Sequence, residues 1–138
     1  MSPIVLNSIA VIAGLLVGSI VNMGLVSLGG ALVPLSEGAD VSTMEGLAEA
    51  MQQFELKHFI SPFLAHALGT LVGACFAAKI AATRKLTMAL IIGFAFLAGG
   101  VFMVLSIPSP IWFNGLDLVI AYIPMAYLGF KLVNPNSG

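Results

Sequence analysis

Four long apolar stretches, joined by short polar or proline-containing connections, make up most of the chain. They cover residues of about 4–30, 58–82, 86–106 and 111–132. Each stretch is as long as the roughly 20 residues that an α-helix needs to cross a hydrocarbon core. The pattern therefore predicts an all-α, polytopic membrane protein with four transmembrane helices in one domain, residues 1–138.

One polar segment, residues 36–57, separates the first two apolar stretches and holds five of the six acidic residues. Within it, Ser42 and Glu45 have the spacing of a helix capping box, and apolar residues recur at helical spacing from Met44 to Met51. We expect a short amphipathic helix here, lying on the membrane surface.

Prolines refine this outline at three places. Pro62 is expected in the first turn of the second helix, where the missing N–H costs little. Pro108 and Pro110 predict a tight turn between the third and fourth helices. Pro124 lies in the middle of the fourth helix, leaves the carbonyl of Ile120 without its amide partner, and predicts a kink.

The basic residues predict the orientation. Lys79, Arg84 and Lys85 cluster around the second connection, and Lys131 lies near the C-terminus, which leaves only Lys57 on the opposite side. Basic residues prefer the cytoplasmic side of a membrane. We therefore expect a multi-pass protein of the bacterial inner (plasma) membrane, with cytoplasmic N- and C-termini and a periplasmic polar segment.

Small residues at i, i+4 spacing predict where the helices approach each other. Burial of apolar surface does not drive helix association in lipid, so backbones must come close at small side chains. Gly14 and Gly18 form such a stripe on the first helix, and Gly69 and Gly73 form one on the second. The stripes can pack within one chain or between subunits, and a homo-oligomer is expected.

Composition excludes several classes of function. Charged residues make up 8% of the chain, against about 25% in soluble domains, which favours the lipid bilayer as the surrounding medium. A net charge of −1 argues against a nucleic-acid partner. The single cysteine, Cys75, excludes a dithiol redox site, and no catalytic, metal-binding or cofactor motif is found. We expect neither an enzyme nor a bound cofactor.

Three polar residues, Asn22, His66 and Asp117, are predicted to lie at similar depth in the outer half of the membrane. A helical rise of about 1.5 Å per residue puts Asn22 roughly 12 Å and Asp117 roughly 9 Å below the outer helix ends. A carboxylate at such a depth should face protein or water, and His66 is the expected partner of Asp117. Because imidazole titrates near neutral pH, the pair could relay protons or couple proton movement to a substrate.

Each candidate also has a purely structural interpretation. The His66–Asp117 pair and Asn22 could be interhelical hydrogen bonds. Asp117 could instead reach water from the first turns of its helix. Pro124 could line a permeation path or merely be tolerated by neighbouring helices. Tyr122 and Tyr127 are expected to be core or interface aromatics.

The run LAHALGTLVGACFAAKIA (residues 64–81), the IPSPIWF turn (residues 107–113) and the polar outer segment resemble a group of uncharacterised small four-helix bacterial inner-membrane proteins. The resemblance implies the topology and a bacterial origin. It implies no activity.

Two functions are therefore considered first. The polar residues and Pro124 favour a transporter or channel component for a small solute or ion. The alternative is a non-catalytic structural or regulatory membrane protein that docks a periplasmic protein partner through residues 36–57. An enzyme acting on lipid or quinone comes third, because no nucleophile, metal cluster or redox pair accompanies the apolar stretches.

Overall fold

The computed structural model describes residues 1–35 and 37–137, and the described chain is helical with no strands. Four helical spans are long and apolar enough to cross a membrane, and the last of them consists of two helices. The elements are α1 (Pro3–Leu32), α2 (Met44–Met51), α3 (Leu56–Ile80), α4 (Lys85–Ser106), α5 (Ile111–Ile120) and α6 (Ile123–Val133).

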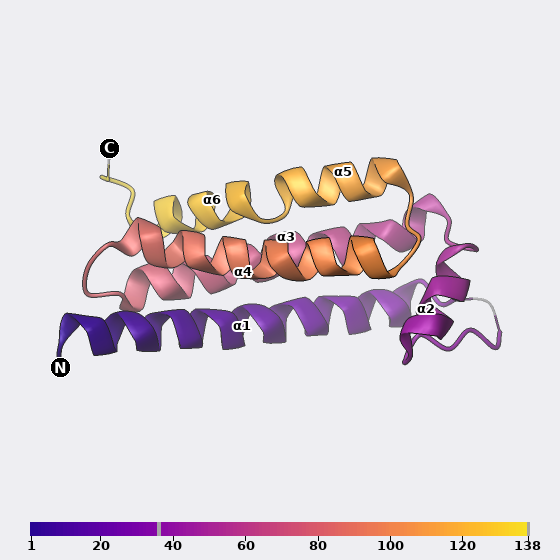
Figure 1. Ribbon diagram of the computed structural model, residues 1–138, viewed down its shortest axis with the longest axis horizontal. Coiled ribbons are helices and arrows are strands. Elements are labelled where there is room, and N and C mark those ends of the chain that lie inside the picture. Colours follow the sequence, from indigo (N-terminus) through magenta and orange to yellow (C-terminus); the bar gives the residue numbers. More distant parts are fainter. Residues whose placement is uncertain (36, 138) are drawn as a thin grey trace.

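The long helices run side by side along the length of the molecule (Figure 1). Both chain termini and the α3–α4 connection lie at one end, here called the terminal end. The short helix α2 and the α4–α5 connection lie at the other, the α2 end. Of the long helices, α1 packs mainly on α3, and α3 also contacts α4 and α6.

The predicted helix bounds agree with the structure to within two residues, with one informative difference at α3. This helix begins at Leu56 because the amide of Glu55 donates a hydrogen bond of 2.9 Å to Nδ1 of His58. A histidine thus takes the place of the usual glutamate or glutamine of a capping box. The expectation that Pro62 lies in the first turn is therefore wrong, since the helix already contains six residues before it.

The predicted amphipathic helix is present as α2, but its predicted cap is wrong. Thr43, not Ser42, caps the helix: its Oγ1 accepts a hydrogen bond of 3.0 Å from the amide of Gly46. Ser42 instead donates to Oδ1 of Asp40 from both its hydroxyl, at 2.6 Å, and its amide, at 2.9 Å. These two hydrogen bonds lower the pKa of the exposed Asp40 carboxyl. Ser36, the first residue of the predicted polar segment, lies outside the described residues.

The two glycine stripes meet within one chain, between α1 and α3. A Cβ atom added to Gly14 would lie 2.7 Å from the carbonyl oxygen of Gly73, and one added to Gly18 would lie 2.7 Å from that of Gly69. Backbone contacts this close leave no room for any side chain, so these stripes hold α1 against α3. A homo-oligomer stays a prediction.

The fourth span is broken, not merely kinked, near Pro124. Regular hydrogen bonding ends where the amide of Ala121 donates to the carbonyl of Asp117, and it resumes where Ala126 donates to Tyr122. Pro124 therefore lies in the first turn of α6, a position where its missing N–H is not required. The break leaves Ala121 and Tyr122 between the two helices.

Candidate functional site

The central feature of the site is a contact between His66 of α3 and Asp117 of α5. Nδ1 of His66 lies 2.8 Å from Oδ1 and 3.0 Å from Oδ2 of the carboxylate. When the carboxylate is ionised, it only accepts hydrogen bonds, and Nδ1 then carries the hydrogen. Asp117 is only 3% exposed. The interpretation that it reaches water by itself is therefore wrong, and the predicted pairing with His66 is confirmed.

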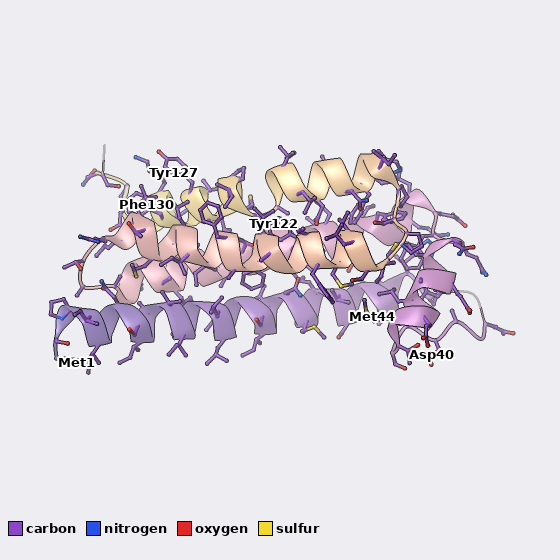
Figure 2. All side chains as sticks on the ribbon, viewed as in Figure 1. Met1, Asp40, Met44, Tyr122, Tyr127 and Phe130 are labelled. Carbon is purple, nitrogen blue, oxygen red and sulfur yellow. The ribbon has the colours of Figure 1, made fainter. Side chains whose placement is uncertain are left out.

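Tyr122 completes a three-residue cluster that the sequence did not reveal. Its hydroxyl donates a hydrogen bond of 2.8 Å to Oδ2 of Asp117, and its ring stacks on His66 with the centroids 5.8 Å apart. The residue is fully buried, as expected of a core aromatic, but its polar end belongs to the site. Figure 2 shows Tyr122 in the middle of the molecule, at the gap between α5 and α6.

The break in the fourth span explains how Tyr122 reaches Asp117. Five residues of continuous α-helix rotate the chain by about 500°, so the two side chains would point in directions about 140° apart. The backbone at Tyr122, with φ −115° and ψ −79°, departs from the regular helix values of about −63° and −42°, and this departure removes the constraint. Gly100 of α4 provides the space, because a Cβ there would lie 2.5 Å from the tyrosine hydroxyl oxygen.

Two cavities adjoin this cluster, and His66 lines both. The first, which we name the α2-side cavity, has a volume of about 290 Å³, lies beneath α2 and includes Asp117 in its wall. The second, the α1–α4 cavity, has a volume of about 380 Å³ and extends between α1 and α4. The walls share His66, Gly100 and Met103. The imidazole, whose side chain is 25% exposed, thus stands at the boundary of the two spaces.

Asn22 lies near His66 but not against Asp117. It lines the α1–α4 cavity together with His66, whereas Asp117 lines the α2-side cavity. Its Oδ1 is buried and accepts no hydrogen bond from any described residue. Leaving such an oxygen unsatisfied costs about 1–3 kcal/mol, so the position suits a donor from water or from a ligand. The three residues of the predicted layer are therefore connected through His66. Asn22 shares the α1–α4 cavity with His66, and Asp117 shares the α2-side cavity with it.

Pro124 lines neither cavity among the described residues, so its contribution is the break that positions Tyr122. Within residues 1–35 and 37–137, no lysine or arginine lines either cavity, and Asp117 is the one carboxylate that does. The same residues contain no group of three His, Cys, Asp or Glu side chains that could hold a metal ion. The site therefore offers one buried carboxylate, one imidazole and one phenol in apolar surroundings.

Comparisons with known protein families, with curated proteins and with solved structures gave no match to this chain. The resemblance to small four-helix bacterial inner-membrane proteins accordingly stays a hypothesis. The function has to be argued from the site itself.

Proposed function

We propose that the chain is a multi-pass protein of the bacterial inner membrane, with both termini in the cytoplasm and α2 in the periplasm. Long helices expose large apolar side chains along their length, among them Ile12, Leu16 and Ile20 of α1, which would be unfavourable in water. Four of the five basic residues lie at or near the terminal end, around the α3–α4 connection and at the end of α6. The positive-inside rule supports a cytoplasmic location for that end.

We further propose that the protein transports a small solute or ion, or forms a channel component for one, through the site at His66. The observation that carries this proposal is the position of His66, which borders both cavities while its Nδ1 is hydrogen-bonded to the buried Asp117. A site for a transported solute needs polar groups that face an accessible space at depth in the bundle. His66 and Asp117 supply such groups.

The cluster also contains a side chain that can carry a proton. An imidazole is the side chain whose ordinary titration falls between about pH 5 and 8. Because Nδ1 is held by Asp117, proton exchange would take place at Nε2, the other nitrogen of the ring. Tyr122 and Asp117 would keep the ring in one orientation while its charge changes. This arrangement favours transport that is coupled to protons.

Flux measurements in proteoliposomes test the proposal. Vesicles containing a pH-sensitive dye would be exposed, under an imposed pH gradient, to a panel of inorganic ions, organic acids, amines and quaternary ammonium compounds. Asp117→Asn should lower the flux of the transported solute by about tenfold or more, equivalent to about 1.4 kcal/mol. The matched control is Glu45→Gln, the same kind of change at an exposed position of α2. Equal fluxes for Asp117→Asn and the wild type, across the whole panel, would contradict the proposal.

A docking function is the second candidate, and the charge of the α2 end favours it. The five acidic residues of this region are exposed, whereas Leu47 and Met51 of α2 line the cavity beneath. The outward surface is thus acidic and suits a basic partner. Copurification with wild type and with Glu45→Lys/Glu49→Lys tests this idea, and an unchanged set of partners would exclude it.

A further inference from the structure

The charge of the α2-side cavity indicates the sign of its ligand. Asp117 is the only carboxylate in the described wall, and no lysine or arginine balances it. Among residues 1–35 and 37–137, Tyr122 is the one other titratable group that contacts the His66–Asp117 pair. The described residues of α1 and α4 contribute no titratable side chain to the wall, and Glu45 and Glu49 of α2 are exposed. With Asp117 ionised and His66 neutral, the described wall therefore carries one uncompensated negative charge.

The remaining wall is mostly apolar and indicates the body of the ligand. Side chains from five helices and their connections form it, including the aromatic rings of Phe54 and Phe113. Aromatic faces attract cations and accept hydrocarbon groups. A molecule with an apolar body and one positive charge satisfies both kinds of surface.

An inorganic cation fits the same wall poorly. Such ions need several oxygen ligands to replace their water; calcium, for example, takes 6 to 8. Besides Asp117, the side-chain oxygens in the described wall are the hydroxyls of Ser61 and Ser109 and the amide oxygen of Asn114. These oxygens are neutral, so the single charge of Asp117 would have to compensate for most of the lost hydration. An organic cation, which is weakly hydrated, does not require this.

We propose that the site binds a hydrophobic organic cation in exchange for a proton, an inference that rests on the proposed transport function. The carboxylate of Asp117 is neutralised by one positive charge at a time, either the proton on His66 or the cationic group of the ligand. As the ligand enters, the imidazolium releases its proton from Nε2 to water in the cavity, and neutral His66 keeps its Nδ1–H bond to Asp117. The net charge of the site is unchanged by the exchange.

Binding to the purified full chain in nanodiscs of zwitterionic phosphatidylcholine tests this exchange without requiring transport. The probe is radiolabelled benzyltrimethylammonium, whose charge does not depend on pH. We expect saturable binding that is weaker near pH 5 than near pH 8, the range over which histidine ordinarily titrates. Wild-type protein in weak buffer should also release protons when the probe is added, detected with a pH indicator.

Two comparisons make the result specific. Phenylmethanesulfonate, an anion of similar shape, should fail to compete with the probe. Asp117→Asn should weaken binding at least about tenfold, whereas Glu45→Gln should leave it unchanged. The selection by charge and the proton release are measured on wild-type protein, so they remain decisive even if Asp117→Asn does not fold.

Absence of saturable binding, equal competition by the anion, or affinity that is the same at both pH values would overturn the exchange proposal. The outcome is separable from that of the flux experiment. Flux of another solute that depends on Asp117, without binding of the probe, would reject the organic cation and keep the transport function. Proton-linked binding of the probe without any flux would support the assigned ligand and reject transport.

Discussion

The two halves of the bundle are held together in different ways. Toward the terminal end, backbones meet directly: Gly14 lies against Gly73, and a Cβ on Gly129 of α6 would lie 2.6 Å from the carbonyl oxygen of Leu71 of α3. Toward the α2 end, the helices are joined through the His66–Asp117–Tyr122 cluster and enclose cavities. The comparison shows that one half excludes space through small residues while the other keeps space around polar groups.

This difference assigns different roles to the two halves. Close contacts between backbones resist deformation, because no side chain can move aside to relieve a clash. A tightly packed terminal half can therefore fix the positions of α1, α3 and α6 while the α2 half accommodates a ligand. The two halves should therefore respond differently to substitution.

The largest expected effect comes from Gly73→Leu in the tightly packed half. A Cβ at this position would lie 2.6 Å from the carbonyl oxygen of Gly14, so the backbones of α1 and α3 must separate. We expect a loss of stability of at least about 3 kcal/mol, the upper range for overpacking. The loss of stability is measured by thermal unfolding in detergent, with the disappearance of the monodisperse peak in gel filtration as the readout.

The control for this substitution is Gly24→Leu on α1, where no atom lies within 4 Å of the added Cβ. It should leave the unfolding temperature close to that of the wild type. Similar unfolding temperatures for the two variants would mean that the backbone contact between Gly14 and Gly73 does not hold the terminal half together.

A double-mutant cycle on Asp117→Asn and His66→Gln should give the next largest effect. Each substitution leaves a buried polar group with a poorer partner, at a cost of about 1–3 kcal/mol. Because Nδ1 and Oδ1 are 2.8 Å apart, we expect a coupling energy of about 1–2 kcal/mol between the two sites. Denaturation of the four proteins in the cycle measures it. Additive effects, within about 0.5 kcal/mol, would show that the contact does not hold the α2 half together.

Gly100→Ala should have a smaller effect on stability and a clear effect on the site. The new Cβ would lie 2.5 Å from the hydroxyl oxygen of Tyr122, so the ring must move away from Asp117. We expect a loss of about 1.5 kcal/mol, the lower range for one hydrogen bond to a charged group, together with weaker binding of benzyltrimethylammonium. Gly99→Ala is the control, since nothing lies within 4 Å of its added Cβ. Equal binding of benzyltrimethylammonium by the two variants would show that the position of Tyr122 does not affect the ligand site.

Much of the bundle could be predicted from the sequence because membrane-length apolar stretches and i, i+4 glycines are local signals. The spans, the glycines at which helices approach each other and the partnership of His66 and Asp117 followed from spacing and from the cost of an unpaired buried carboxylate. Spacing did not decide whether the glycine stripes meet within one chain or between subunits. Tyr122 could not be assigned to the site, because five residues of regular helix would direct its side chain away from Asp117. Only the break next to Pro124 brings it there. A proline in the sequence predicts that the helix is disturbed, but it does not predict the resulting path of the backbone.

Gly100 and the cap of α3 were missed for related reasons. The glycine faces a tyrosine that is distant in the sequence, so no local pattern reveals the contact. His58 caps α3 from a position where glutamate or glutamine is usual. The capping box predicted at Ser42 failed because Ser42 bonds to the nearer Asp40. Short polar side chains often choose between such local partners, and spacing alone does not decide the choice.

The smallest expected effect lies at the edge of the α2 half, where Ser42→Ala removes the hydroxyl that donates to Asp40. This hydrogen bond is the main cause of the lowered pKa of Asp40, so the substitution should raise the pKa toward the ordinary value of 3.8. A carboxyl whose pKa is lower in the folded than in the unfolded protein stabilises the fold at pH values above the unfolded pKa. This contribution is lost as the pH falls through the lowered pKa of the folded state. Because Asp40 is exposed, global stability at neutral pH should not change measurably.

An NMR titration of the Asp40 carboxyl measures the shift of its pKa, and probe binding measured in parallel should be unaffected. A change in binding would mean that the start of α2 is coupled to the cavity beneath it, and that the α2 half extends further than the polar cluster.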